Sequence, residues 1–191
     1  MYIAIEGIDT AGKSTQIALL AEKFPQAIIT KEPGATEIGE KIRDLVLSGK
    51  TKSKKAEFLL FLADRAEHVH EVIEPNLKKM IISDRSAVSG VAYALNQGNI
   101  NKKDLVSLNH FATSSIMPKK VFLLKLTKKE LRYRLSQKEL DGIELRGSEY
   151  LLAIQDAMIE SCKLLDIELI EIDATDSIQE ISNKITEQLL I

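Results

Sequence analysis

The chain has 191 residues, of which 45% are hydrophobic and 28% are charged, and its formal net charge at pH 7 is −2. This length and balance predict one soluble domain with a substantial core, whereas a general nucleic-acid-binding protein would show an excess of basic residues. The single cysteine, Cys162, excludes an intramolecular disulfide framework and a thiolate zinc site, and it favours a reducing compartment.

The chain begins with MYIAIEG, which has neither the basic start nor the long apolar segment of a signal peptide. No apolar run in the sequence approaches the roughly 20 residues of a membrane span. We therefore expect a cytoplasmic protein that binds neither membranes nor nucleic acid. His68, His70 and His110 are scattered along the chain, which favours solvated positions on helices over a metal site.

Short apolar runs alternate with longer amphipathic stretches, a pattern that predicts strands and helices in turn. The continuous apolar character of MIIS and VFLL is typical of strands that are covered on both faces. The alternation predicts an α/β three-layer sandwich with a five-stranded, mainly parallel sheet, formed by a single domain over residues 1–191. Strands are expected at residues 2–7, 27–34, 80–85, 120–126 and 168–175, and helices at 13–23, 36–49 and 53–79, the last disturbed near Pro75.

The first predicted strand leads into residues 7–14, GIDTAGKS, which satisfy the phosphate-loop (P-loop) pattern G-x-x-x-x-G-K-[ST] between a strand and a helix. Gly7 and Gly12 permit a backbone geometry in which the N–H groups of the loop point at phosphate oxygens. Lys13 supplies a positive charge for the β- and γ-phosphates, and the Ser14 hydroxyl is the expected ligand of Mg²⁺. The predicted nucleotide contacts are Gly7, Ile8, Asp9, Thr10, Ala11, Gly12, Lys13, Ser14 and Thr15.

The strand predicted at residues 80–85 ends in Asp84, the arrangement of a Walker-B-like carboxylate that reaches magnesium through water. An aspartate at the end of an apolar strand can also serve as a helix cap, so both interpretations stay open. With the first interpretation, Ser14 and Asp84 form the predicted metal site.

Residues 101–104, NKKD, match the N-K-x-D string with which GTPases read guanine. In a GTPase the string follows a strand, whereas here it leads into a helical stretch, and Asn101 as the N-cap of that helix explains it. The only D-x-x-G lies inside the P-loop, which also argues against a GTPase.

A small-molecule kinase instead needs a cationic acceptor pocket and a closing lid that excludes water. The polar stretch at about residues 136–148 is too long for an ordinary connection and is a candidate lid. Basic side chains suited to such a site end strands and helices or approach the lid, at Arg65, Arg85, Arg132, Arg134 and Lys138.

Six motifs run in order along most of the chain: IAIEGIDTAGKSTQ, KEPGATEIGEKIRDLVL, FLLFLADRAEHV, SDRSAVSGVAYA, LDGIE and IEIDAT. In this combination they resemble the bacterial type of the thymidylate (dTMP) kinase family. The resemblance implies a P-loop NTPase fold with a small lid, and ATP and Mg²⁺ as cofactors. It also implies transfer of the γ-phosphoryl group of ATP to dTMP, giving dTDP for dTTP synthesis and DNA replication, by a homodimer.

The same resemblance assigns roles in the acceptor site. Asp9 lies near the sugar and its 3′-hydroxyl, Phe61 stacks on thymine, and Arg65 donates to a base carbonyl. Arg85 bridges the donor and acceptor phosphates, a task suited to the planar fork of an arginine. From the residues alone, Phe61 and Tyr93 also fit ordinary packing, and Arg65 also fits pairing on the helix surface. The implied substrate-binding residues are Asp9, Pro33 on the pocket floor, Phe61, Arg65, Arg85, Ser89, and Tyr93 crowding the 2′ position of the sugar.

The chain departs from the family pattern in the acceptor site and in the P-loop. Lys31 precedes EPG where the family usually has arginine. Gly90 stands where many members carry a base-binding amide, a role that would pass to water or to Ser89. Thr10 leaves the P-loop without the arginine that some members have there.

The lid also departs from the pattern. Members without a P-loop arginine tend to place arginines in the lid, but Gln137 and Gly142 occupy such positions here. Arg134 and Arg146 flank the core of the lid and remain as candidates, although a solvated basic helix face explains them equally well. The predicted catalytic residues are Lys13, Arg85, Arg134 and Arg146.

Two alternatives to a dTMP kinase stay open from the sequence. One is a kinase for another nucleoside monophosphate or a deoxynucleoside, against which Phe61, Arg65 and Tyr93 argue. The other is a non-catalytic nucleotide-binding protein, against which the intact Lys13 and Arg85 argue.

Overall fold

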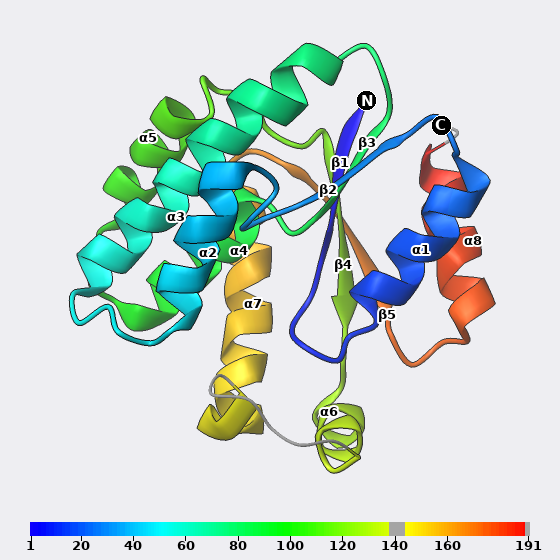
Figure 1. Cartoon of the computed structure of the whole chain (residues 1–191). Helices are drawn as coiled ribbons and strands as arrows, with labels where there is room; N and C mark the ends of the chain where they lie inside the picture. Colours follow the sequence, from blue (N-terminus) through cyan, green and yellow to red (C-terminus); the bar gives the residue numbers. More distant parts are fainter. Residues whose placement is uncertain (138–143, 190–191) are drawn as a thin grey trace.

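The chain folds around one parallel β-sheet (Figure 1). The computed structural model describes residues 1–137 and 144–189. Five strands lie in the order β2-β3-β1-β4-β5 and each neighbouring pair is parallel, which confirms the predicted sheet. In register, Ile3 lies opposite Ile82 on one side and Lys120 on the other. The strands are β1 (Tyr2–Glu6), β2 (Ile28–Lys31), β3 (Ile81–Asp84), β4 (Lys120–Lys125) and β5 (Glu168–Asp173).

Helices cover both faces of the sheet (Figure 1). One face carries α1 (Lys13–Lys23) and α8 (Ile178–Leu189). The short helix α6 (Lys128–Leu135) lies beyond the carboxyl end of β4. None of the described helices is both long enough and apolar enough to cross a membrane. The other face carries α2 (Glu37–Leu47), α3 (Lys54–His68), α4 (Ala87–Gln97), α5 (Lys102–Ala112) and α7 (Ser148–Leu164).

The helix predicted over residues 53–79 is disturbed, as expected, but the disturbance begins before Pro75. Helix α3 ends at His68 and is followed by a π-helical turn, Val69–Ile73, and by a 3₁₀ turn, Glu74–Asn76. Pro75 lies inside this 3₁₀ turn, and Glu74 before it keeps a helical conformation, so the proline does not by itself end the helical run. The spacing of apolar residues in the sequence does not predict the π-helical turn at Val69–Ile73.

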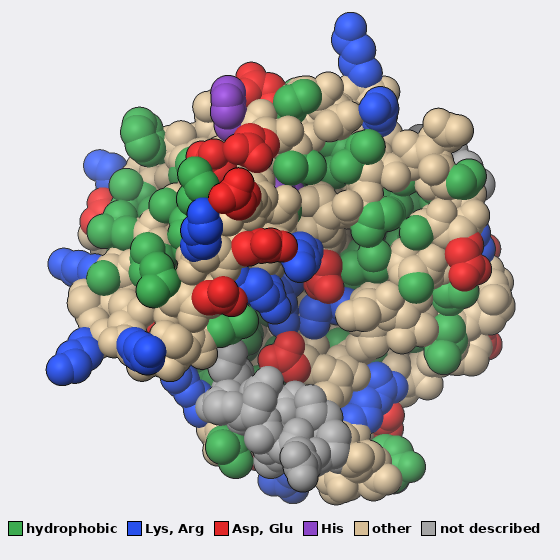
Figure 2. Space-filling model, viewed as in Figure 1, with side chains coloured by type: hydrophobic (Ala, Val, Ile, Leu, Met, Phe, Trp, Pro, Cys, Tyr) green, Lys and Arg blue, Asp and Glu red, His purple; other side chains and the backbone are tan. Residues whose placement is uncertain are grey.

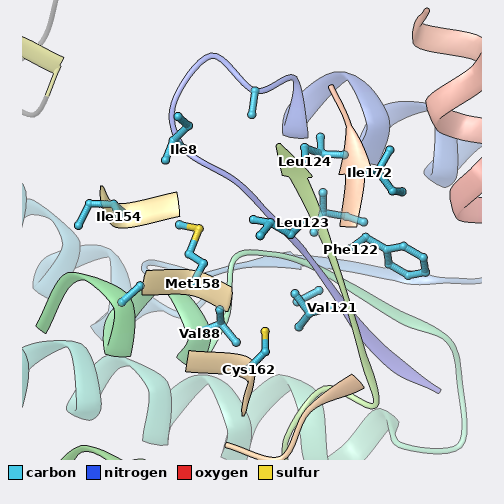
Figure 3. Close-up of a cluster of buried hydrophobic side chains, with 14 of the residues drawn as sticks. Ile8, Val88, Val121, Phe122, Leu123, Leu124, Ile154, Met158, Cys162 and Ile172 are labelled. Atoms are coloured by element: carbon cyan, nitrogen blue, oxygen red, sulfur yellow. The ribbon is translucent and has the colours of Figure 1, made fainter. Parts of the chain in front are cut away.

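The largest part of the core lies between the central strands and the helices α4 and α7 (Figure 3). Four consecutive residues of β4, Val121, Phe122, Leu123 and Leu124, are fully buried, as predicted for a strand covered on both faces. Cys162 of α7 packs into this core, and burial raises the pKa of its thiol to about 12. Cys162 is therefore a packing residue and not a reactive thiol.

The NKKD string begins helix α5, as predicted, and does not follow a strand. The Asn101 side-chain carbonyl accepts a hydrogen bond from the Asp104 backbone N–H at 2.9 Å. The Asn101 amide also donates to the Asp104 carboxylate at 2.7 Å. Both polar ends of Asn101 are thus used in capping the helix, which confirms the helix-start interpretation.

The substitution Asn101→Ala is expected to lower the free energy of unfolding by about 1 kcal/mol, because it removes an N-cap side chain. Urea denaturation of the purified variant measures this loss. Lys103→Ala, in the same exposed turn, serves as the control and should change stability by less than about 0.5 kcal/mol. A change in the preference for ATP over GTP in N101A would instead support a guanine-reading role.

Candidate active site

The P-loop turns from the end of β1 into the start of α1. Gly7 has a φ of +152°, and a Cβ there would come within 3.0 Å of the Leu124 carbonyl oxygen. Gly12, with a φ of +98°, is the N-cap of α1, and no side chain in the described part of the chain caps that helix. The first-turn N–H groups of α1 are therefore left for an anion, which is what a phosphate cradle requires.

Lys13 lies folded against the P-loop that precedes it. Its ammonium donates to the carbonyl oxygens of Gly7 at 3.0 Å and Ile8 at 3.2 Å, and it lies 3.9 Å from the Asp9 carboxylate. Burial, and next the positive charge of Arg85, lower the pKa of Lys13 to about 8. Phosphate anions beside this ammonium would favour its protonated form, so the loop is suited to a highly charged ligand.

Arg85 joins the P-loop to the start of α4. Its guanidinium donates to the Asp9 carboxylate at 2.7 Å, to the Ser89 hydroxyl at 3.1 Å and to the Gly7 carbonyl at 3.3 Å. The backbone of Arg85 is left-handed, with a φ of +69°, a conformation that costs free energy in a residue other than glycine. The structure therefore brings together three of the predicted site residues, Asp9, Arg85 and Ser89.

Tyr93 lies one turn of α4 beyond Ser89, half-buried and partly packed against the core. Burial raises the pKa of the Tyr93 hydroxyl to about 12, and the charges of Arg85 and Asp9 also act on it. Tyr93 is thus on the same helix as Ser89, one turn further along, with its hydroxyl largely withdrawn from solvent.

Arg65 is buried and does not pair on the surface of its helix. Its Nε donates to the Glu32 carboxylate at 2.8 Å, and its Nη1 donates to the Asn109 side-chain oxygen at 2.9 Å. A Cβ at Gly90 would come within 2.9 Å of the Arg65 Nη2 atom. Any side chain at position 90 would therefore displace the Arg65 guanidinium. Glycine at this position leaves the space that the buried guanidinium occupies.

His68 is fully buried, so its predicted solvated position is wrong. Its ring nitrogens lie 3.0 Å from the Glu32 carboxylate and 2.7 Å from the Thr30 hydroxyl. Burial opposes the ionisation of Glu32, but Arg65 and His68 outweigh it and hold the pKa of this carboxyl below its usual value. Glu32 and His68 were not predicted as site residues, although Glu32 follows a strand at the same sheet edge as Asp84.

Phe61 lies one turn before Arg65 on α3 and is half-buried. The core positions of this helix are instead taken by Phe58 and Leu62, and Phe61 does not belong to the core cluster. The interpretation of Phe61 as plain helix core is therefore not supported. Phe61 and Arg65, four residues apart, lie on the same side of α3.

The EPG turn after β2 is tied to α3 through Asp64. The Pro33 carbonyl accepts from Arg43 at 2.9 Å, and the Gly34 N–H donates to the Asp64 carboxylate at 2.8 Å. Asp64 is buried, and its burial raises the pKa of this carboxyl to about 6 even though the Gly34 hydrogen bond lowers it. Asp64 thus fixes the position of Pro33 relative to Phe61 and Arg65.

Ser14, Asp84 and Lys31 line one cavity of about 490 Å³ between α1, β2 and the EPG turn. One Asp84 oxygen is buried without a hydrogen-bond partner among the described residues. Ser86, and not Asp84, caps α4, because its hydroxyl accepts from the Val88 N–H at 3.2 Å. The helix-cap interpretation of Asp84 is therefore wrong. A hydroxyl and an unpartnered carboxylate oxygen in one cavity fit a magnesium ion that takes its other ligands from water and phosphate.

Over the described ranges, no group of three or more His, Cys, Asp and Glu side chains could hold a metal ion by itself. Figure 2 shows basic and acidic side chains gathered in the hollow near the centre of one face. The site therefore concentrates charge that a phosphorylated ligand and its metal ion would match.

The two predicted lid arginines have different surroundings. Arg134 donates to Glu130 at 2.7 Å, to the Thr10 carbonyl of the P-loop at 3.0 Å and to the Ala174 carbonyl at 2.7 Å. Arg146 is exposed, with its guanidinium 5.0 Å from the Tyr150 ring centre and 2.9 Å from the Tyr150 hydroxyl. The core of the predicted lid, with Lys138 and Gly142, lies outside the described residues.

Comparisons with known proteins agree with one another. A family model described as Thymidylate kinase matches residues 5–185. The thymidylate kinase of Sulfurimonas denitrificans is 68% identical to this chain over 100% of both sequences. The thymidylate kinase of Aliarcobacter butzleri is 55% identical over 99% of this chain and 98% of its own length. The crystal structure of thymidylate kinase from Ehrlichia chaffeensis matches with a TM-score of 0.75 at 26% identity, covering 100% of this chain and 98% of that one.

The raised pKa of Asp64 predicts a specific pH dependence of stability. Below about pH 4 both the folded and the unfolded states carry a protonated Asp64, and the folded state keeps that proton up to about pH 6. The contribution of Asp64 to the free energy of unfolding is therefore full below pH 4 and falls by up to about 3 kcal/mol as the pH rises through 6.

Asp64→Asn should lack this fall, so that its stability relative to the unsubstituted protein rises between pH 4 and 7. Urea denaturation across this range measures the difference, and Asp44→Asn, at an exposed position, controls for the loss of a negative charge. Parallel stability curves for D64N and the unsubstituted protein would contradict the prediction.

Proposed function

The chain belongs to the thymidylate kinase family, and we propose that the residues described above perform the reaction of that family. As a member, the chain is an ATP-dependent phosphotransferase that converts dTMP to dTDP, a step in dTTP synthesis for DNA replication. The observation that carries the assignment of the site is the place of Arg85. Its guanidinium joins the P-loop through Asp9 to α4 through Ser89, a junction suited to a cation between two phosphates.

On the donor side, the N–H groups of residues 7–15 and the Lys13 ammonium bind the ATP phosphates. The Ser14 hydroxyl and the Asp84 carboxylate would hold Mg²⁺, since both line one cavity and Asp84 has an unpartnered buried oxygen among the described residues. When bound, this ion neutralises charge on the β- and γ-phosphate oxygens.

On the acceptor side, Phe61 stacks on the thymine and Arg65 donates to it, with Pro33 below and Ser89 nearby. The half-buried ring of Phe61 and its spacing from Arg65 on one helix support this arrangement. Asp9 lies beside the sugar, and Tyr93 excludes a 2′-hydroxyl, a role supported by its place on α4 one turn beyond Ser89.

Transfer between two phosphates depends on alignment and on neutralisation of charge. Arg85 supplies a fixed guanidinium at the junction, and Asp9 orients it through the 2.7 Å ion pair. Arg134, on α6 just before the candidate lid at about residues 136–148, and Arg146 within that range add two further cations for the phosphates. The hydrogen bond from Arg134 to the Thr10 carbonyl supports a link between the lid side and the P-loop.

We propose one kinase domain over residues 1–191 that forms a homodimer in the cytoplasm. Exposed apolar side chains on α2, α3 and α5 support an interface on that side of the molecule, which carries apolar side chains in Figure 2. The single buried thiol, Cys162, is compatible with a reducing compartment. The apolar side chains in question are Ile38, Leu45, Leu47, Leu59 and Phe111.

The purified protein is expected to release ADP from Mg–ATP with dTMP as acceptor and to turn over other nucleoside monophosphates much more slowly. In the same assay, Tyr93→Ala should raise the relative kcat/KM for the ribonucleotide form of TMP by roughly tenfold, because the side chain that crowds the 2′ position is lost. Absence of dTMP-dependent turnover above the ATPase background would contradict the function. An unchanged ribose-to-deoxyribose ratio in Y93A would contradict the role of Tyr93.

Arg85→Ala should lower kcat by roughly 10²–10³-fold, because a single charged donor at the transferring phosphate is lost. Equilibrium binding of ATP should change little, since the P-loop and Lys13 remain. Steady-state kinetics with isothermal titration of ATP distinguishes the two effects. Near-normal turnover in R85A would remove Arg85 from the mechanism.

A further inference from the structure

The end of β1 carries a carboxylate, Glu6, that has no exposed surface. The Ser86 hydroxyl donates to Glu6 Oε1 at 2.9 Å, and the Ser89 N–H donates to the same oxygen at 3.3 Å. The Ser89 hydroxyl donates to Glu6 Oε2 at 2.6 Å, the shortest of the three contacts. All three donors belong to the start of α4, so Glu6 ties the P-loop strand to that helix.

Ser89 also contacts the arginine at the centre of the site. Its hydroxyl oxygen accepts a hydrogen bond from Arg85 Nη1 at 3.1 Å. A hydroxyl has a single proton, and a carboxylate can only accept, so Glu6 takes that proton and leaves the oxygen lone pairs for Arg85. The direction of the Ser89–Arg85 hydrogen bond is therefore set by Glu6.

Within the described part of the chain, Glu6 forms no ion pair of its own and reaches Arg85 through Ser89. Its negative charge nevertheless acts on both Arg85 and Lys13. Burial raises the pKa of the Glu6 carboxyl, whereas Arg85 and the two serine hydroxyls favour its charged form. A buried carboxylate costs free energy unless it is hydrogen-bonded. Because Glu6 accepts from the Ser86 and Ser89 hydroxyls and from the Ser89 N–H, the cluster is a satisfied polar network, which holds its members in fixed positions.

We propose that Glu6 is a positioning residue for phosphoryl transfer, which orients the Arg85 guanidinium through the hydroxyl of Ser89. The inference rests on the proposed role of Arg85. Arg85 needs such support because its side chain is long and its backbone is left-handed, so the Asp9 ion pair fixes only one end of the planar fork. The other end, Nη1, is held by the Ser89 hydroxyl at 3.1 Å and by the Gly7 carbonyl at 3.3 Å, and Glu6 fixes Ser89.

Glu6→Gln tests the direction of the hydrogen bonds while keeping the shape of the side chain. In E6Q, an amide N–H group replaces Oε2 and donates to the Ser89 hydroxyl oxygen. The single hydroxyl proton of Ser89 must then point toward Arg85 Nη1. Because Nη1 is also a donor, the Ser89–Arg85 hydrogen bond is lost. E6Q is expected to lower kcat about tenfold, equivalent to about 1.4 kcal/mol in activation free energy, with the KM for ATP within about twofold. Ser89→Ala should cause a loss of similar size.

The double variant E6Q/S89A separates positioning from independent effects. If Glu6 acts through Ser89, the double variant should have about the kcat of S89A alone. Losses that multiply, to about 100-fold, would overturn the proposal because they would show that Glu6 acts without Ser89. Melting temperatures of all variants identify losses that come from unfolding.

Ser86→Ala is the matched control, because Ser86 also donates to Glu6 and caps α4 but makes no side-chain contact with Arg85. S86A should lower the melting temperature at least as much as S89A and kcat much less. Equal kcat losses in S86A and S89A would overturn the proposal, and this comparison decides the question even if E6Q does not fold. Normal kcat in R85A would overturn the proposed role of Arg85 in phosphoryl transfer. If R85A loses activity but S89A has normal kcat, only the positioning of Arg85 by Glu6 through Ser89 is overturned.

Discussion

Strands β1 and β3 are parallel neighbours, with Ile5 opposite Asp84, so the segments that follow them leave the sheet at the same edge. One segment is the P-loop and the other carries Arg85 into α4. Residues almost 80 positions apart in sequence thereby come within hydrogen-bonding distance, as between Arg85 and Asp9. Strand β2 adds the EPG turn at the same edge, because Lys31 pairs with Asp84. The donor and acceptor halves of the site therefore depend on the register of three strands.

This edge holds charged groups that would be unfavourable elsewhere in a protein interior. Glu6, Lys13, Glu32 and Arg65 are each more than nine-tenths buried. Every one of them has charged or polar partners, and removal of one partner would leave a buried charge that costs several kcal/mol. These buried charges are therefore stabilised by one another and by polar partners in place of solvent.

Local signals in the sequence were sufficient for the five strands, for the helices α1, α2, α3 and α5 and for the strand–loop–helix context of the phosphate loop. The helix start after Gly12 and the capping of α5 by Asn101 depend on neighbours within a few residues, and both are found as predicted. The burial of His68 was not predictable in this way, because its partners Thr30 and Glu32 lie in and directly after β2, more than 30 residues earlier in the chain. The interpretation of Arg65 as a surface residue failed for the same reason, since Glu32 is 33 residues away.

The fold follows from local patterns in the sequence, whereas the roles of individual site residues follow from the family resemblance. Phe61, Arg65, Ser89 and Tyr93 were named through a family resemblance, and no periodicity in the sequence distinguishes them from packing residues. Glu6 carries no such signal either, because a glutamate at the end of an apolar strand is an ordinary feature. Its importance became visible only once α4 was placed against β1.

Arg134 binds the P-loop and the segment after β5 through the backbone carbonyls of Thr10 and Ala174. A carbonyl oxygen is present whatever side chain a position carries. Positions 10 and 174 can therefore diverge during evolution without loss of these two hydrogen bonds. Position 134 has no such freedom, because a shorter side chain or a lysine could not donate to both carbonyls and to Glu130 at once. These two hydrogen bonds therefore depend on the identity of the arginine and not on the side chains of Thr10 and Ala174.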